Sequence, residues 1–426
     1  MDNSRFVAVK IVERVLKDAA WVSPLLKSYR NNLKSRDLDF ITELSYGTVK
    51  HLLFLETLIN FSLKKKNFKD FSPFEKALLT VGTYELLFLN KPVYATVSSY
   101  VELAKKHIGT GYAKLVNALF RKLKTADIPN LPEHIKFSFP ESLFRYLKQR
   151  MDDSFFNDFI YHSLATHSTY IRVISPKDFM QSIPGTTNLY FPETYKILDS
   201  ATFFRNYDKF QFVFQDLSSQ IAQHLVPYVP RGTYIDLAAA PCNKASFLAQ
   251  QYHDINVIAN DIHIKKLQRF KNDYILSLKN LTLVCSDATK RAFKSNTFDV
   301  VIIDVPCSGL GTLRRKPEIK YRITPEKINE ILRLQQNILE TAQEIVKIGG
   351  YLVYMTCTIN PDENEGQIEK FLKRHKDFII EQHEDSFKFS YKSTPFGVYI
   401  DGLKNDCDYF FVSILKRCKN ENIDFN

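Results

Sequence analysis

The chain has 426 residues, too many for one hydrophobic core, so two or three domains are expected. Hydrophobic residues make up 45% and charged residues 25%, which is ordinary for a folded soluble protein. No apolar run approaches the roughly 18 residues that span a bilayer, and the amino terminus lacks the basic-then-apolar layout of a secretion signal. These features exclude a membrane protein and favour a cytoplasmic location.

The net charge of +11 is concentrated in the first third of the chain. Residues 1–150 contain 25 Lys and Arg against 14 Asp and Glu, whereas the remainder has 33 of each sign. This asymmetry indicates a polyanionic partner, most simply nucleic acid. The alternative is a soluble, lysine-rich surface with no partner.

Residues 1–127 are predicted to form a helical bundle. Apolar residues recur at helical spacing from Phe6 to Leu16, and Ser72-Pro-Phe-Glu75 has the form of a capped helix start. Further helices are expected over 77–89, 97–108 and 112–123. A proline-marked stretch then begins a small α/β linking module at 128–211, with a helix over 143–150 and a strand over 169–174.

Residues 212–426 alternate between strand and helix patterns, which is typical of an α/β doubly wound, mostly parallel sheet. Strands are expected at 233–237, 256–260, 281–285, 298–303, 351–355 and 409–415. Helices are expected at 246–251, 264–278, 325–346 and 363–374. In such a sheet the chain starts in the middle and returns, so that the fourth and fifth strands lie on the other side of the first.

Two of the six cysteines follow directly on strongly apolar strands: Cys307 in Asp304-Val-Pro-Cys and Cys357 in Thr356-Cys-Thr. The expected topology brings both thiols and the loop after Asp236 to one edge of the sheet, where open α/β sheets bind ligands. A thiolate beside an acid there indicates covalent chemistry on an electron-poor ring. The remaining cysteines show no Cys-x-x-Cys spacing, so neither a metal site nor a disulfide framework is expected.

A cofactor site is predicted at the same edge. Its loop is expected to present backbone amides and a helix start to a ligand, and the acids that end successive strands suit a nucleoside. Asp261 is placed to accept from ribose hydroxyls and Asp287 from an adenine amino group. The predicted cofactor-binding residues are Ala238, Ala239, Ala240, Pro241, Cys242, Asn243, Lys244, Asp261, Asp287 and Asp304.

On these motifs the chain resembles the RsmB (Sun/Fmu) family of bacterial 16S ribosomal RNA cytosine-C5 methyltransferases. The most specific matches are the segment from Asp304 to Glu318 and the segment from Tyr354 to Asn364. The resemblance covers essentially the whole chain. It implies a Rossmann-like methyltransferase sheet, a NusB-like amino-terminal domain, S-adenosylmethionine as cofactor and ribosomal RNA as partner. Separately, a monomeric protein is expected, although the sequence does not fix the oligomeric state.

The resemblance also implies roles for three residues. Cys357 is expected to attack C6 of cytosine, which turns C5 into a carbon that can take a methyl group. Cys307 is expected to assist release, and Asp304 to pair with the base near N3. A thiolate at Cys357 requires a depressed pKa, which is expected there.

Four basic residues follow the first cysteine: Arg314, Arg315, Lys316 and Lys320. They are predicted to contact RNA phosphates, because Lys and Arg neutralise backbone charge. A solvated basic loop is the alternative. Since a target base must be unstacked to reach a thiol, single-stranded or loop RNA is the expected substrate.

One departure from the family's pattern lies in the cofactor loop, where Cys242 and Asn243 replace two glycines. Glycine permits positive φ and close backbone approach, so lowered cofactor affinity or a reshaped loop is expected. A catalytically weakened RNA-binding or ribosome-assembly factor is therefore the competing hypothesis. Methylation of DNA is a third.

Overall fold

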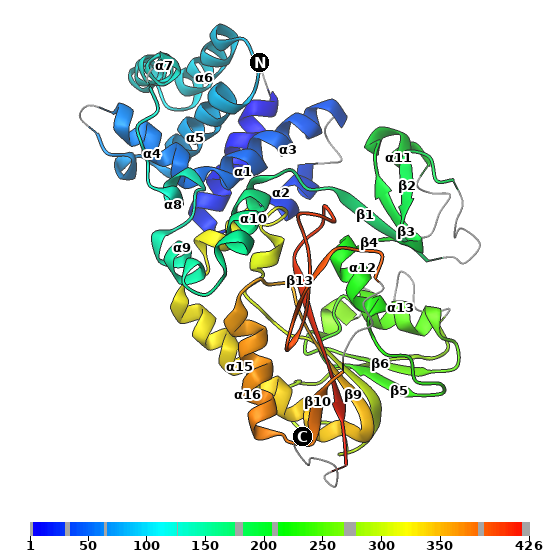
Figure 1. Ribbon diagram of the computed structural model, residues 1–426. Helices are drawn as coiled ribbons and strands as arrows, with labels where there is room; N and C mark the ends of the chain where they lie inside the picture. Colours follow the sequence, from blue (N-terminus) through cyan, green and yellow to red (C-terminus); the bar gives the residue numbers. More distant parts are fainter. Residues whose placement is uncertain are drawn as a thin grey trace. The chain divides into compact units, whose positions relative to one another are not determined.

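The computed structural model describes residues 3–29, 35–63, 66–125, 127–174, 182–206, 212–267, 278–381 and 387–419 (Figure 1). They divide into two compact units. The helical unit comprises Met1–Gln149, Asp153–Ala165 and Leu313–Thr324; the α/β unit comprises Arg150–Asp152, Thr166–Thr312 and Pro325–Asn426. Within the described parts, no helix is both long and apolar enough to cross a bilayer.

This division differs from the three consecutive domains expected from the sequence. The first part of the expected linking module, up to Ala165, packs with the helical bundle, and its strands belong to the α/β unit. A short segment from the middle of the region expected to form the doubly wound sheet, Leu313–Thr324, also belongs to the helical unit.

The helices expected in the helical unit are present, with shifts of a few residues at their ends: α1 (Asn3–Asp18), α5 (Pro73–Phe88), α6 (Val93–His107), α7 (Thr110–Thr125) and α9 (Glu141–Lys148). The other helices of this unit are α2 (Val22–Tyr29), α3 (Ser35–Lys50), α4 (Leu52–Ser62), η2 (Phe68–Asp70), α8 (Glu133–Lys136), α10 (Asp153–Leu164) and η7 (Pro317–Tyr321).

Helix α5 forms the core of this unit, with every residue from Ala77 to Leu86 buried. The predicted cap is present, because the Ser72 hydroxyl accepts from the Glu75 amide and the Glu75 carboxylate accepts from the Ser72 amide. A buried charge is also satisfied here: the carboxylate of Glu85 accepts from the Arg5 guanidinium and, at 2.9 Å, from the Tyr100 hydroxyl.

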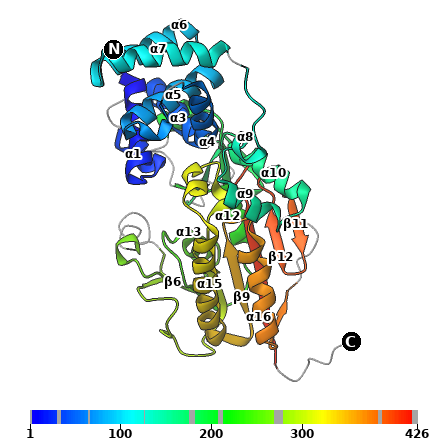
Figure 2. The same cartoon turned by 90° about the vertical axis from the view of Figure 1, so that its left-hand side faces the viewer.

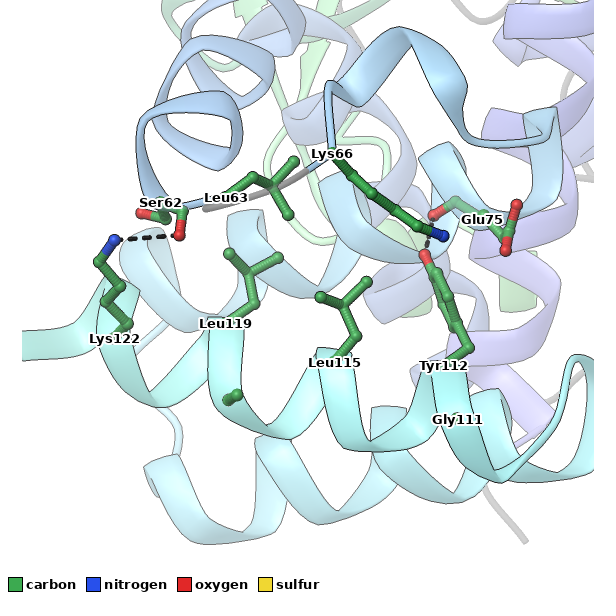
Figure 3. Close-up of a pocket in the computed structure, with 10 residues that line it drawn as sticks. Ser62, Leu63, Lys66, Glu75, Gly111, Tyr112, Leu115, Leu119 and Lys122 are labelled. Atoms are coloured by element: carbon green, nitrogen blue, oxygen red, sulfur yellow. Dashed lines mark hydrogen bonds between the residues drawn. The ribbon is translucent and has the colours of Figure 1, made fainter.

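A pocket of about 820 Å³ lies within the helical unit, between α7 and the segment from the end of α4 to the start of α5 (Figure 3). Leucine side chains face its interior, and Lys122 closes one end by donating to the Ser62 carbonyl at 3.0 Å. None of the residues predicted to bind cofactor or to catalyse lines this pocket. Its lining residues are Ser62, Leu63, Lys66, Glu75, Gly111, Tyr112, Leu115, Ala118, Leu119 and Lys122.

The α/β unit contains a large mixed sheet of strand order β11-β12-β13-β9-β8-β5-β6-β7, with β10 paired to β13. Strands β9, β8, β5, β6 and β7 are parallel, and β10 to β13 are antiparallel. The strands are β5 (Thr233–Asp236), β6 (Asn256–Asn260), β7 (Leu281–Val284), β8 (Phe298–Asp304), β9 (Val346–Thr356), β10 (Phe378–Ile380), β11 (Tyr391–Thr394), β12 (Gly397–Ile400) and β13 (Phe410–Arg417).

The predicted doubly wound sheet is therefore confirmed. The fourth expected strand, β8, pairs with the first, β5, and the fifth, β9, lies one place further out. The extra strands β10, β11 and β12 were not predicted.

Helices cover both faces of this sheet (Figures 1 and 2). Helix α12 (Leu217–His224) and α13 (Asn243–Gln251) pack on one face, and α15 (Pro325–Ile345) and α16 (Glu365–Arg374) on the other. Right-handed crossovers that run in opposite directions from the middle of a sheet require this arrangement. The expected helix at 264–278 falls largely on 268–277, outside the described residues.

A second, antiparallel sheet of order β2-β3-β1-β4 precedes the large one in the chain. Its strands are β1 (Thr169–Val173), β2 (Thr186–Leu189), β3 (Phe191–Ile197) and β4 (Phe212–Phe214), with α11 (Ser200–Asn206) before β4. Only β1 was expected from the sequence. Its small core is formed by apolar side chains that include Ile171, Tyr195 and Phe203.

Candidate active site

The two cysteines singled out in the sequence lie side by side. Strands β8 and β9 are parallel neighbours, with Asp304 level with Met355, and a cysteine follows the end of each strand. The Sγ atoms of Cys307 and Cys357 are 3.3 Å apart, and both side chains are half-buried. The predicted meeting of the two thiols at one edge of the sheet is confirmed.

The loops that carry the thiols are tied together by short contacts. The Gly311 amide donates to the Cys357 carbonyl at 3.0 Å, and the hydroxyls of Ser308 and Thr358 are 2.7 Å apart. A Cβ atom at Gly311 would lie 2.8 Å from the Cys357 oxygen and 2.3 Å from the Tyr409 oxygen, so only glycine allows this approach.

Asparagine 364 fixes the backbone around Cys357. Its side-chain oxygen accepts from the Thr356 hydroxyl at 2.6 Å, and its side-chain nitrogen donates to the Thr358 carbonyl at 3.0 Å. The residues on both sides of the cysteine are thus held by one fully buried amide.

The environment of Cys307 favours its protonated form. The hydrogen bond with Cys357 is the largest cause of a raised pKa for Cys307, and burial and the carboxylates of Glu363 and Asp304 act in the same direction. Because the two sulfurs are in hydrogen-bond contact, the protonation of one thiol depends on that of the other, and at least one thiol of the pair stays protonated near neutral pH.

Lysine 244 and Asp304 form an ion pair beside the cysteines. The lysine Nζ donates to Asp304 Oδ2, and the lysine is buried. Burial lowers the pKa of Lys244, but the carboxylates of Asp304 and Asp236 outweigh it and raise the pKa overall. Lys244 was predicted to bind the cofactor. In the structure its ammonium group donates to Asp304, the acid expected to pair with the base.

The loop over 238–244 does not present its amides as predicted. The Ala239 amide donates to the Asn260 carbonyl at 2.8 Å, the Ala240 amide to the Asp261 carboxylate at 3.0 Å, and the Ala238 amide to Asp236 at 3.3 Å. The Cys242 amide donates to the Ala239 carbonyl. The prediction that these four amides face a ligand is wrong, because protein acceptors hold them.

Cysteine 242 adopts the backbone conformation that glycine would favour, with φ 69° and ψ 16°, directly before α13. Its side chain is fully buried, and burial, with Asp236 and Asp261, raises the pKa of the thiol to about 12. Packing of this apolar side chain therefore stabilises a left-handed turn that costs a non-glycine residue about 1 kcal/mol.

The acids at the ends of the parallel strands retain hydrogen-bond acceptor capacity that a nucleoside could use. Each oxygen of Asp261 accepts one protein amide, from Ala240 and His263, and a carboxylate oxygen can accept a second donor. Asp287 Oδ1 accepts both the hydroxyl and the amide of Thr289, which lowers the pKa of Asp287 and keeps it charged. These carboxylates, with the start of α13, fit the hydroxyl and amino donors of an adenosyl group.

Two of the four predicted phosphate contacts are wrong. Lys320 is 1% exposed, donates from Nζ to the Lys50 carbonyl at 2.7 Å, and has a pKa lowered well below its usual value by burial. Arg314 is 3% exposed and lies 3.1 Å from the His162 ring. Both side chains belong to the core of the helical unit. Lys316 is exposed and Arg315 partly so.

The doubly wound sheet, with two neighbouring thiols and several carboxylates at the carboxyl ends of its parallel strands, has the fold of the Rossmann-like methyltransferases. The comparisons identify the family. Residues 223–416 match the model of the 16S rRNA methyltransferase RsmB/F family, and residues 2–125 match the NusB family. The probable ribosomal RNA small subunit methyltransferase B of Synechocystis sp. is 32% identical over 381 residues, which cover 83% of this chain and 85% of that protein.

The chain therefore belongs to the RsmB family of ribosomal RNA small subunit methyltransferases, and its cofactor is S-adenosylmethionine. The ribosomal RNA small subunit methyltransferase B of Thermus thermophilus is 27% identical, with 96% of this chain and 94% of that protein covered. Among solved structures, PH0851 shows the same fold, with a TM-score of 0.77 at 21% identity over 97% of this chain and 99% of that one.

Several residues that organise the site were not predicted. Glu363 and Asn364 stand in the quoted motif after Cys357, but their sequence context is that of a helix start. Arg172, in the middle of β1, carries no sequence signal beyond being a charge within an apolar strand. Gln335 lies on α15, and its side chain donates to the Pro306 carbonyl at 3.0 Å.

Proposed function

We propose that this chain transfers a methyl group to C5 of a cytosine in small-subunit ribosomal RNA, through a covalent bond between Cys357 and C6 of the base. The observation that carries the proposal is the 3.3 Å separation of the Cys307 and Cys357 sulfurs. The adjacent Lys244–Asp304 ion pair adds a charged group that can face the same base.

The chemistry assigns a separate task to each residue. Cytosine C5 becomes nucleophilic when the Cys357 thiolate adds to C6, because the electron pair of the C5–C6 double bond moves to C5. Asp304, held by Lys244, would stabilise a proton at N3 that favours this addition. S-adenosylmethionine, when bound, supplies the electrophilic methyl group. Cys307 would then assist as the C5 proton leaves and the bond between C6 and sulfur breaks.

For the cofactor, we assign Asp261 to the ribose hydroxyls and Asp287 to the adenine amino group. Both carboxylates retain acceptor capacity beyond their protein partners. The turn over 238–244 would support the cofactor by its shape and by the first turn of α13, since four of its amides are already engaged. For the RNA, Lys316 and Arg315 remain the proposed phosphate contacts.

The test is methyl transfer from labelled S-adenosylmethionine to small-subunit ribosomal RNA transcripts, followed by digestion to nucleosides. The expected product is 5-methylcytidine. Methylation at another atom or on another base would contradict the proposal. Bisulfite sequencing of ribosomal RNA from cells with and without the protein would then locate the modified cytosine.

A weakened methyltransferase that acts mainly as an RNA-binding or ribosome-assembly factor is the second candidate. It is favoured by one observation, Cys242 in a left-handed turn where the resemblance expects glycine. Titration calorimetry separates the two candidates. Binding of S-adenosylmethionine at micromolar concentration supports the enzyme, and binding only at millimolar concentration supports the factor.

A further inference from the structure

The buried carboxylate of Glu363 lies close to the cysteine pair and takes no part in the mechanism above. Glu363 ends the short helix η8 (Pro361–Glu363) and is fully buried. Within the described parts of the chain it has no Lys or Arg partner; its carboxylate accepts only from neutral donors. Burying a carboxylate without a cation costs free energy, so a neutral residue would be the simpler choice if packing were its only role.

The two oxygens of Glu363 each hold a different cysteine loop. Oε2 accepts from the backbone amide of Ser308, the residue after Cys307, at 2.7 Å. Oε1 accepts from Asn360 Nδ2 at 2.9 Å and from the hydroxyl of Thr358, the residue after Cys357, at 3.5 Å. One side chain thus joins the residues that follow both cysteines.

A glutamine on helix α15 also holds this carboxylate by a hydrogen bond. Gln335 Nε2 donates to Glu363 Oε2 at 3.2 Å and to the Pro306 carbonyl, and Gln335 Oε1 accepts from Gln367 at 3.0 Å. Gln335 and Gln367 are buried. The position of Glu363 is therefore set by the sheet-covering helices as well as by the two loops.

We infer that Glu363 is a positioning residue that fixes the separation of the two cysteine sulfurs by holding both loops through a single carboxylate. The inference rests on the proposed function for its meaning, because that reaction needs both sulfurs at one base. The charge of Glu363 also affects the site, because this carboxylate is among the groups that raise the pKa of Cys307 and so favour its protonated form.

The test measures sulfur proximity without RNA or cofactor. Diamide oxidises two neighbouring thiols to a disulfide and takes up the two hydrogens itself, so its rate reports how often the Cys307 and Cys357 sulfurs meet. The full-length protein would be treated under denaturant-free conditions, and the Cys307–Cys357 disulfide quantified by peptide mass spectrometry. A failure of methyl transfer in the wild-type protein would refute the proposed function without affecting this measurement.

The variant Glu363→Gln keeps the volume but replaces one acceptor oxygen with a donor, so it can hold only one loop. We expect disulfide formation to slow by about 10-fold and kcat to fall by about 100-fold, with S-adenosylmethionine affinity unchanged. The matched control is Glu369→Gln on α16, an exposed carboxylate paired with Lys373, which should leave all three quantities unchanged.

A second variant separates positioning from folding. Glu363→Gln combined with Asn360→Asp exchanges donor and acceptor, so the new amide can donate to the new carboxylate and the link to residue 360 is restored. The double variant should recover disulfide formation to within about 3-fold of wild type. Either a wild-type rate in the folded single variant or no recovery in the double variant overturns the inference.

Discussion

The guanidinium group of Arg172 donates a hydrogen bond of 3.1 Å to the backbone carbonyl of Asn243, the first residue of α13. The same side chain is fully buried, donates to Gln215 and Gln250 at 3.0 Å each, and lies over the Phe247 ring. Arg172 therefore couples the small antiparallel sheet to the turn proposed to support the cofactor.

Replacing Arg172 by Lys should weaken S-adenosylmethionine binding by about 10-fold. A lysine cannot supply the forked set of donors that arginine provides. Each buried acceptor left without a donor costs about 1–3 kcal/mol, and the turn before α13 would shift to reduce this cost. Titration calorimetry measures the affinity, and thermal unfolding measures the stability. The exposed Arg205→Lys is the control. A lower melting temperature with unchanged affinity would confine Arg172 to a stabilising role.

Replacing Cys357 by Ala should reduce methyl transfer by at least about 10³-fold, because the proposed reaction requires addition of the Cys357 sulfur to C6. Binding of RNA and of S-adenosylmethionine should not change, since the thiol is not a binding group in the proposal. Filter binding and calorimetry check both. Normal turnover by this variant would remove Cys357 as the nucleophile.

Replacing Cys307 by Ala should trap a covalent protein–RNA adduct, because addition and methyl transfer proceed while release is impaired. The adduct would appear as a slowly migrating band on a denaturing gel that disappears when Cys357 is also replaced. Product release at the wild-type rate, without such a band, would show that Cys307 has another task.

Much of the α/β unit could be predicted from its sequence because the parallel strands are strongly apolar runs. Strands β8 and β9 are of this kind. Cys307 comes three residues after the end of β8 and Cys357 directly after the end of β9, so the meeting of the two thiols follows from strand order. The short polar strands β11 and β2 carry no comparable pattern, and they were missed for that reason.

Long-range partners explain the errors at the basic segment. Lys320 has a sequence environment typical of an exposed loop, yet its acceptor, the Lys50 carbonyl, lies 270 residues earlier in the chain. The hydrogen bond between Glu363 and the Ser308 amide likewise joins residues that are 55 positions apart in the chain. The residues next to Lys320 and Glu363 in the sequence give no indication of these distant partners. The burial of Lys320 and the positioning contacts of Glu363 could therefore not be predicted.

Replacing Cys242 by Gly should change S-adenosylmethionine affinity by no more than about 3-fold, although the resemblance suggests a larger gain. The turn already has the left-handed backbone that glycine would supply, with φ 69°. Relief of strain, about 1 kcal/mol, is offset by the loss of a fully buried side chain, about 1 kcal/mol. A 10-fold gain on calorimetry would mean that the turn differs when the cofactor is bound.

Asp236 should make stability depend on pH in a definite direction. Burial, assisted by the Asp304 and Asp261 carboxylates, raises the pKa of Asp236 to about 7, even though Lys244 opposes the shift. The folded protein therefore binds a proton more tightly than the unfolded chain, whose Asp has a pKa of about 3.9. The contribution to the free energy of unfolding is greatest below about pH 4 and is lost as the pH rises to about 7.

The comparison of wild type with Asp236→Asn isolates this contribution, because other titrating groups are common to both proteins. Between about pH 4.5 and 7, the free energy of unfolding of wild type minus that of the variant should fall by on the order of 1 kcal/mol per pH unit. Urea unfolding followed by circular dichroism measures it. The control is Asp254→Asn, since the Tyr228 hydroxyl lowers the pKa of Asp254 and its contribution is constant above about pH 4. A flat difference for Asp236→Asn would mean that this carboxyl group is ionised throughout the range, with Lys244 shared between Asp236 and Asp304.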